Sequence, residues 1–426
     1  YKIRDLNNHL TTKALIGNGF VYFAEHNNAG SNSRYRLNYF DGNLSETKLL
    51  LSDKVSTPES FELYKGSAFF DWSQQNIVVG TSTVSDNTEV FRSDTTIENT
   101  NLILDVYPGS VVSGGNTISY SSKPKSFFVI GNYLYFQAKV GSSNNVYRFN
   151  SDFTFTGTTN SSWNTGTNWR AGITPGLKDL VNVPSGFTVE INSSAFGNDI
   201  NINSPVNILS GNLNVAGHLN LSSRITLNNN NVTLKGNSSS VAGDATSYIV
   251  TNGTGKVSVE NIDAARGTVN LPIGTTTNFN PITLANTGTS DTFSARVETG
   301  VASTYSGETQ GTTMTTNGVN ATWFINEETI GGSNATVGLQ WDDTQELSGF
   351  NRTTANMGHY NGIFWEGIVG SLSGSNPYTY VASGITSFSP FGMLNPSLLN
   401  IDLFDKTTFM VYPNPSNGNF TIQVPD

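Results

Sequence analysis

The segment between Ile200 and Leu234 carries pairs of apolar residues at a regular spacing, and this pattern constrains the fold more than any other feature of the chain. One polar residue separates the two members of each pair, and a new pair begins every six or seven residues. Because alternate residues of a strand point to the same side, each pair predicts a very short strand with two inward side chains. The pairs are Ile200/Ile202, Val206/Ile208, Leu213/Val215, Leu219/Leu221, Ile225/Leu227 and Val232/Leu234.

Short strands at this spacing are typical of a β-solenoid or a tight β-meander. The gaps between the pairs are filled by Asn, Gly and Ser. Asparagine tolerates a left-handed backbone and forms hydrogen bonds within its own turn, so it suits these positions. We expect residues 159–260 to form a small stacked β-module.

The remainder of the 426-residue chain also favours strands. No sustained apolar pattern at three-to-four spacing is bounded by helix-capping residues. Short alternating runs between Gly, Asn, Ser or Pro recur from end to end. Charged residues are only 13% of the chain and aromatic residues 11%, a composition that fits tight turns and packed strands better than disorder. The predicted fold class is all-β.

The N-terminal segment, residues 1–158, contains a loose internal repeat. LIGNGFVYFAEHNNAGSNSRYRLNYFDG, from Leu15, is similar to VIGNYLYFQAKVGSSNNVYRFNSD, from Val129. Each unit is too small to bury its own apolar face, so we expect propeller-like repetition. The units resemble ELW-x-x-DGT type repeats of bacterial surface β-propellers, with VFRSDTT at the signature position and both its Trp and its Gly replaced. Three units are too few to close a ring, so we expect further units upstream.

Two tryptophans, Trp163 and Trp169, open the stacked module. They resemble the W-x-x-x-x-x-W motif of large secreted Bacteroidetes proteins. We expect both indoles to pack on the end of the stack.

Residues 261–393 have longer alternating runs at the spacing of a β-sandwich. We expect Trp323, Phe324 and Trp341 in its core. The combination of LPIGT, TWFINE and SGITSFSPFGM resembles a domain of unknown function in secreted Bacteroidetes proteins, and this resemblance implies no activity.

Catalytic patterns are sparse. The absence of cysteine excludes disulfides, thiolate metal sites and a cysteine nucleophile. The four histidines are far apart in dissimilar contexts. Two carboxylate doublets occur, Glu327/Glu328 and Asp342/Asp343. The two members of a doublet point to opposite faces of a strand, so neither doublet can form a glycosidase pair by itself. Such a pair would have to combine Glu327 with Asp342 or Asp343 from a neighbouring strand. A solvated strand end or a weak Ca²⁺ site is the alternative, and the chain has no D-x-D-x-D-G loop. We expect no cofactor.

The stretch GHYNGIFWEG is a candidate glycan-binding loop. Tyr360 and Trp365 could present aromatic faces to sugar rings, with Asn361 and Glu366 as polar partners. The alternative is a hairpin with Phe364 in the core and Tyr360 or Trp365 capping an edge.

The tail contains the most informative motif. After a linker at 394–408, residues 409–426 include VYPNPSNGNFTI, which resembles the opening of the type A C-terminal sorting domain of the type IX secretion system. The matching residues are Tyr412, Pro413, Asn414, Pro415, Gly418, Phe420 and Ile422. The two prolines fix φ and lack backbone donors, so they separate the module from earlier strands. The resemblance implies that the remainder of such a domain follows Asp426.

The resemblance implies a secreted protein of the Gram-negative Bacteroidetes, exported to the cell surface. It implies three partners: the outer-membrane translocon, its β-barrel shuttle protein and a sortase-like enzyme. The formal net charge of −10 argues against nucleic acid. We expect a non-enzymatic adhesin or display body that could bind an extracellular glycan. The alternative is a polysaccharide lyase or glycosidase delivered by the same route, with Arg224 or Lys235 as the nearest bases on the stack.

Overall fold

The computed structural model confirms the all-β class. Within the described residues, helix is limited to three 3-10 turns, at Gly166–Asn168, Asp343–Gln345 and Pro396–Leu398. None of them has the length that a membrane crossing needs. The structure describes residues 14–17, 20–27, 34–40, 48–54, 58, 60–79, 82–97, 100–113, 116–131, 133–388, 390–399, 410–412 and 421–423.

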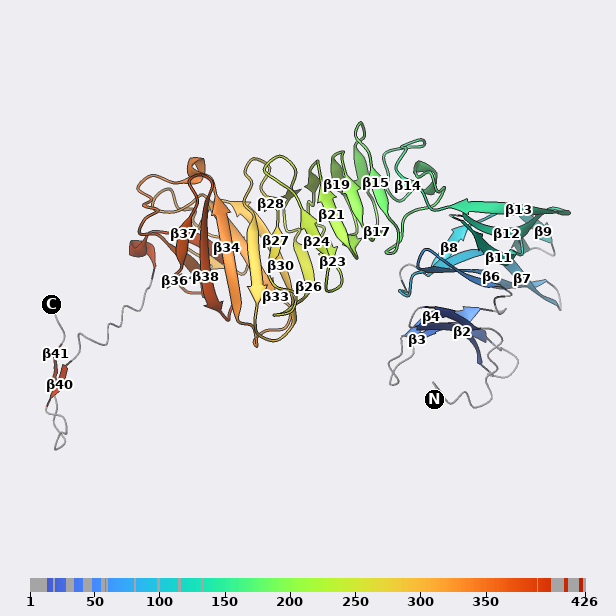
Figure 1. Ribbon diagram of the computed structural model, residues 1–426, viewed down its shortest axis with the longest axis horizontal. Coiled ribbons are helices and arrows are strands. Elements are labelled where there is room, and N and C mark those ends of the chain that lie inside the picture. Colours follow the sequence, from blue (N-terminus) through green and yellow to red (C-terminus); the bar gives the residue numbers. More distant parts are fainter. Residues whose placement is uncertain are drawn as a thin grey trace.

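Antiparallel sheets make up the described residues between 14 and 150 (Figure 1). The first sheet contains β1 (Ala14–Gly17), β2 (Phe20–Asn27), β3 (Arg34–Phe40) and β4 (Lys48–Lys54). The second contains β5 (Phe61–Tyr64), β6 (Ser67–Val79), β7 (Ser82–Ser93) and β8 (Asn101–Leu104). The third contains β11 (Lys125–Ile130), β12 (Tyr133–Val140) and β13 (Ser143–Asn150), and β9 (Ser110–Ser113) pairs with β10 (Asn116–Ser119).

The second sheet lies between the first and the third. Successive residues of β6 point to opposite faces. Phe70 therefore joins a buried cluster with Tyr22 and Leu37 of the first sheet. Phe69 contacts Phe149 of the third sheet, with ring centroids 5.3 Å apart. The aromatic side chains of the repeats thus pack between successive sheets.

Three parallel sheets follow, and we call residues 181–274 the three-sheet stack. Between residues 181 and 262 consecutive strands fall in the three sheets in turn, so the parallel partner that follows a strand is the third one after it. One sheet contains β14 (Phe153–Thr154), β15 (Val181–Val183), β18 (Ile200–Ile202), β21 (His218–Leu221) and β24 (Ser240–Ala242). The second contains β16 (Val189–Ile191), β19 (Val206–Ile208), β22 (Ile225–Thr226), β25 (Ile249–Val250) and β28 (Ile273–Gly274). The third begins with β17 (Ala195–Gly197), β20 (Leu213–Val215), β23 (Val232–Leu234) and β26 (Val257–Ile262).

The apolar pairs of the sequence stack on one another inside these sheets. In one ladder Val181 pairs with Ile200, and Ile200 pairs with Leu219. All members of the six predicted pairs are buried, as two inward side chains per short strand require. Because every ladder is parallel, a strand's partner lies about one full turn of three strands further along the chain.

The third sheet of the stack does not end with the stack. It continues antiparallel from β26 through β30 (Asp291–Thr299), β33 (Ala321–Glu327), β39 (Pro390–Leu394) and β35 (Asn356–Tyr360) to β36 (Trp365–Ile368), giving nine strands in all. The expected boundary at 260/261 falls within β26. A five-stranded antiparallel sheet contains β27 (Val269–Leu271), β29 (Ile282–Asn286), β34 (Ala335–Trp341), β38 (Tyr378–Ile385) and β37 (Ser371–Ser373). Of the three expected core aromatics, Trp323 and Trp341 share one buried cluster and Phe324 lies in another.

The two opening tryptophans pack where the stack begins. Trp163 and Trp169 are buried, with ring centroids 4.8 Å apart and planes at 71°. Trp169 also meets Phe155 edge to face, and Phe155 follows β14, which pairs with β15. The predicted packing role of both indoles is confirmed.

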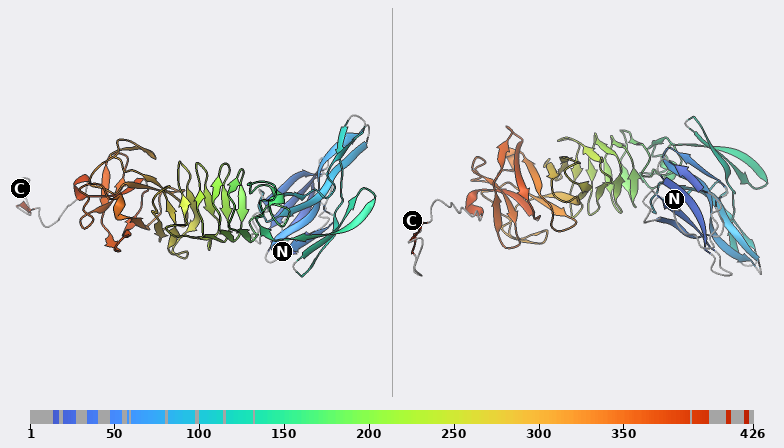
Figure 2. Two further views of the ribbon diagram at one scale, coloured as in Figure 1. Left: turned by 90° about the horizontal axis from the view of Figure 1, so that it is seen from above. Right: turned by 60° about the horizontal axis from the view of Figure 1, so that its bottom comes forward.

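The parts lie in line along the molecule. Figures 1 and 2 show the N-terminal sheets at one end, the three-sheet stack in the middle and the antiparallel sheets beyond it. Two further short pairs complete the described strands, β31 (Tyr305–Ser306) with β32 (Thr309–Gln310) and β40 (Met410–Tyr412) with β41 (Thr421–Gln423).

Candidate ligand-binding groove

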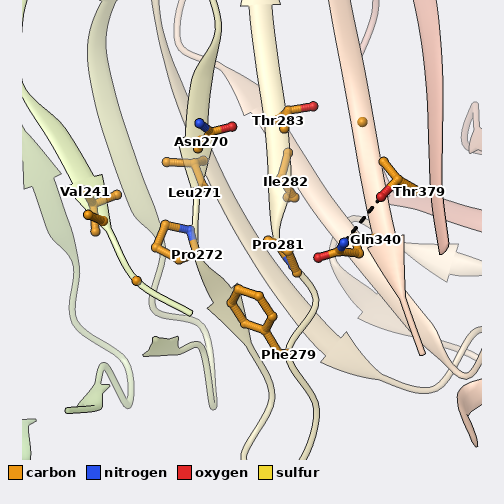
Figure 3. Close-up of a pocket in the computed structure, with 13 residues that line it drawn as sticks. Val241, Asn270, Leu271, Pro272, Phe279, Pro281, Ile282, Thr283, Gln340 and Thr379 are labelled. Carbon is orange, nitrogen blue, oxygen red and sulfur yellow. Dashed lines mark hydrogen bonds between the residues drawn. The ribbon is translucent and has the colours of Figure 1, made fainter. Parts of the chain in front are cut away.

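A cavity of about 440 Å³ lies where the three-sheet stack gives way to the five-stranded antiparallel sheet (Figure 3). β24 is the last strand of its parallel sheet, whereas β27 pairs with β29 in the antiparallel sheet. The chain therefore changes sheets at this place and leaves a groove between them. We call it the seam groove. Its lining residues are Val241, Ala242, Gly243, Asn270, Leu271, Pro272, Phe279, Pro281, Ile282, Thr283, Gly338, Gln340 and Thr379.

Neutral polar side chains from neighbouring strands form one side of the seam groove. Asn270 lies opposite Thr283, and Thr283 lies opposite Gly338. Gln340 lies opposite Thr379 and donates a hydrogen bond from Nε2 to the threonine hydroxyl at 3.4 Å. Opposed residues of antiparallel strands share a face, so these amides and hydroxyls gather on one surface.

Gly338 is the residue that keeps this surface flat. A Cβ at this position would lie 2.2 Å from the Thr283 Oγ1 atom, which is far inside contact distance. The Thr283 side chain therefore occupies the space above the glycine.

An apolar wall adjoins the polar surface. Phe279 is half-buried and its ring lies 5.3 Å from that of Tyr248. Pro272 and Pro281 complete the wall (Figure 3). None of the lining residues carries a charge. Apolar surface with a few amides and hydroxyls suits a neutral ligand that has both apolar and hydroxylated surfaces.

A smaller cavity of about 190 Å³ adjoins the seam groove and shares Val241 and Asn270 with it. Arg266 lines this cavity. Its guanidinium donates hydrogen bonds to the backbone carbonyls of Gly236, Ser239 and Glu260. We therefore assign Arg266 a structural role rather than a ligand-binding one. Burial lowers the pKa of Arg266 from its usual value.

The two predicted glycan-binding residues lie elsewhere and are buried. Tyr360 is 4% exposed and Trp365 is 3% exposed. The Trp365 indole donates to the carbonyl of Ala302 at 3.0 Å and meets Tyr305 edge to face. The expectation that these rings are open to a sugar is therefore wrong. The alternative assigned the buried position to Phe364, but Phe364 is the exposed ring of the hairpin, at 39%.

The candidate carboxylate pair does not form. Glu327 ends β33 in the nine-stranded sheet, whereas Asp342 follows β34 in the five-stranded sheet, so the strands are not neighbours as proposed. The Glu327 carboxylate accepts from the Gly331 amide and the Ser333 hydroxyl. Asp342 caps the 3-10 turn Asp343–Gln345. Both groups thus hold local turns, and within the described ranges no three acidic or histidine side chains gather into a metal site.

The bases proposed for a lyase are also held by neighbours. The Arg224 guanidinium lies 4.4 Å from the Tyr248 ring centroid and donates to the carbonyls of Thr246 and Thr276. Lys235 Nζ lies 3.5 Å from a carboxylate oxygen of Glu260.

Of the sorting motif, the structure describes the strands that hold Tyr412 and Ile422. These residues belong to β40 and β41, which pair antiparallel with Tyr412 opposite Thr421 and Val411 opposite Ile422. Pro413, Asn414, Pro415, Gly418 and Phe420 lie outside the described residues.

The residues of the seam groove were not singled out from the sequence. Asn270, Thr283 and Gln340 alternate with buried apolar neighbours, as any outward strand residue does. Only the sheet pairing brings them together. Comparisons with protein-family models, with curated proteins and with solved structures found no match to this chain.

Proposed function

We propose that this chain is a secreted surface protein of the Bacteroidetes, exported by the type IX secretion system, with a non-enzymatic body that binds carbohydrate. In this proposal the N-terminal sheets are propeller-like blades, the three-sheet stack is a β-solenoid and the antiparallel part is a β-sandwich. The arrangement in line supports a display role, because it sets binding surfaces along an extended body (Figure 2).

The tail motif carries the export half of the proposal. Tyr412 and Ile422 belong to a two-stranded hairpin that brackets the proline-containing stretch. Prolines fix φ and lack a backbone donor, so a stretch that contains two of them is suited to recognition as a separate unit. Its proposed partners are the outer-membrane translocon, the β-barrel shuttle and a sortase-like enzyme.

Export is tested by expressing the chain in a bacterium with a working type IX system and in its translocon-deficient mutant. We expect the protein outside the cell only in the first strain, and retention when Tyr412, Pro413 and Pro415 are all replaced by alanine. Replacing the exposed residues Ile330, Ile363 and Val369 by alanine, outside the tail, should leave export unchanged. Equal export from both strains would contradict the route.

The seam groove carries the binding half. Phe279 offers an apolar ring, while Gln340 and Thr379 offer amide and hydroxyl groups, and the lining is uncharged. Sugar rings have apolar faces and hydroxylated rims, so a neutral polysaccharide is the ligand class that fits.

Binding is measured by affinity electrophoresis of the full chain in gels that contain neutral glucans, xylans or mannans. We expect retardation by at least one of them and about tenfold weaker binding for Phe279→Ala or Gln340→Ala, which corresponds to about 1.4 kcal/mol. Phe364→Ala, a half-exposed ring outside the groove, should bind normally. No retardation by any neutral polymer would contradict this half.

Catalysis by the same body is the competing class. A turnover screen on algal and plant polysaccharides would favour a lyase or glycosidase if the chain released oligosaccharides. Activity that disappeared with Arg224→Ala would overturn the non-enzymatic assignment.

A further inference from the structure

The third N-terminal sheet has two faces of different character. Its inner face carries Leu134, Phe136 and Phe149, all buried against the second sheet. Its outer face is formed by rows of opposed residues across β11, β12 and β13. These rows are Lys125–Gln137–Val146, Phe128–Tyr135–Arg148 and Ile130–Tyr133–Asn150, followed by the pair Lys139–Asn144. We call this the outer face of β11–β13.

Large apolar side chains are exposed together on this face. Phe128 is 40% exposed, Ile130 is 60% exposed and Val146 is 64% exposed. Tyr133 and Tyr135 are half-buried between them. A single exposed apolar residue needs no explanation, but a contiguous group on one sheet marks a binding surface.

The aromatic rings are held in a fixed ladder. Phe128 and Tyr135 are stacked, with centroids 5.5 Å apart and planes at 12°. Tyr133 meets Tyr135 edge to face at 6.4 Å. The Arg148 guanidinium lies 4.4 Å from the Tyr133 ring centroid. These mutual contacts orient the rings before any ligand arrives, so little side-chain entropy is lost on binding.

Residues 106–151 carry a net positive charge, whereas the whole chain is negatively charged. Residues 106–151 contain Lys123, Lys125, Lys139 and Arg148 and not one Asp or Glu, in a chain whose net charge is −10. Lys125, Lys139 and Arg148 lie on the outer face and are exposed. They form no ion pair with other described residues. A local positive field in an acidic protein attracts an anionic partner.

The polar and cationic residues of the outer face of β11–β13 argue against another sheet packing on it. The buried residues of the inner face, which pack on another sheet, are all apolar, whereas burial of Lys125, Lys139 or Arg148 without partners would be costly. The outer face spans about 20 Å along β12, from Tyr133 to Lys139, at about 3.3 Å per residue. This length suits an extended polymer better than a small molecule.

We propose that the outer face of β11–β13 binds an anionic polysaccharide. The rings contact the apolar faces of the sugars, and the three cations pair with carboxylate or sulfate groups. The amides of Gln137, Asn144 and Asn150 accept and donate hydrogen bonds to hydroxyls, which sugars carry at higher density than nucleotides do. This site is separate from the seam groove, and it relies on the proposed function only for exposure to extracellular polymers.

The test uses the full chain and three probes: polygalacturonate, dextran sulfate and neutral dextran of similar length. We expect binding to at least one anionic probe, weakened by added salt because surface charges are screened. Phe128→Ala/Tyr135→Ala should weaken it at least tenfold. Lys139→Gln/Arg148→Gln should weaken it at low salt and flatten the salt dependence. Phe364→Ala and Lys178→Gln, exposed residues elsewhere, should bind like the wild type.

Four results would overturn the proposal. One is absence of binding to both anionic probes, and another is wild-type binding by the ring and charge variants. A third is stronger binding to single-stranded DNA, measured as an additional probe, than to either anionic polysaccharide. Self-association that Val146→Asp abolishes would assign the face to a second copy and would also overturn it. The seam-groove variants should not change binding to the anionic probes. Loss of binding to the anionic probes can therefore be distinguished from failure of the proposed function, because the proposed function is tested by binding to neutral polymers.

Discussion

Arg92 donates a hydrogen bond from Nη1 to Oδ2 of Asp179 at 2.7 Å, and the two residues are 87 positions apart in sequence. Arg92 belongs to β7, and Asp179 precedes the first full strand of the three-sheet stack. Their side chains are 4% and 7% exposed. A second link runs from the amide of Leu177 to the carboxylate of Asp94, the acidic residue of the VFRSDTT stretch. The N-terminal sheets and the stack are thus joined by buried polar contacts.

Breaking this ion pair on one side should be costly. Asp179→Asn leaves the Arg92 guanidinium buried without its counter-charge, so we expect the free energy of unfolding to fall by about 3 kcal/mol. Urea denaturation followed by tryptophan fluorescence measures the loss. Asp152→Asn breaks the pair with Arg170 and should cost less than about 1 kcal/mol, because the Arg170 side chain is 62% exposed and that of Asp152 is 35% exposed. Equal losses for both variants would contradict a special role for Arg92.

The two opening tryptophans should respond differently to the same substitution. Trp169 Nε1 donates to the carbonyl of Trp163 at 2.7 Å, whereas Trp163 Nε1 has no acceptor among the described residues. Trp169→Phe leaves a buried carbonyl without its donor, and Trp163→Phe removes a donor that had no partner. We expect Trp169→Phe to be more destabilising, by about 1–2 kcal/mol, in thermal unfolding monitored by circular dichroism. The reverse order would refute the argument.

Substitutions at Gly338 and Thr283 should have coupled effects on the free energy of unfolding. A Cβ at position 338 overlaps the Thr283 hydroxyl, so Gly338→Ala should destabilise the protein by about 1–3 kcal/mol. Thr283→Ala removes that oxygen and should restore most of the loss in the double variant. A double-mutant cycle on unfolding free energies measures the coupling, and simple additivity of the two changes would exclude it.

His359 should make stability depend on pH. Burial lowers the pKa of His359, and the Glu366 carboxylate, 3.7 Å from Nδ1, only partly opposes this. The unfolded chain then binds a proton at about pH 6.5, where the folded chain does not. Stability should therefore fall as the pH drops below 6.5 towards the lowered folded pKa.

The measurement compares denaturant midpoints at pH 7.5 and 5.5. His359→Leu should lose less stability than the wild type between these two values, because the group that binds the proton is gone. Phe364→Ala, a change at a residue that does not titrate, should lose as much as the wild type. A wild-type-like loss in His359→Leu would exclude His359 as the cause.

Local features of the fold were predictable from the sequence. The pairs Ile200/Ile202 and Leu213/Val215 define β18 and β20, because a short strand needs only two inward apolar residues. Their pairing was not predictable. The turn spacing fits a meander as well as a stack, and a parallel partner such as Leu219 for Ile200 lies well beyond the next strand.

The candidate sites show the same division. Tyr360 and Trp365 appeared accessible because they adjoin a turn, but Tyr305 and Phe324 from other parts of the sequence cover them. The seam groove depends on where β24 stops and β27 leaves for another sheet, and no local pattern marks that change. Export was inferred from the tail motif alone and stays a prediction.

The passage of one sheet from parallel to antiparallel strands has a further consequence. A stack of parallel rungs presents a strand edge at its end, onto which the stack of another copy could add and start a fibre. In the third sheet that edge is occupied, because β30 runs antiparallel along β26 with Ala295 opposite Val257. Another molecule would have to displace β30, and the sheets behind it, before end-to-end polymerisation could begin there.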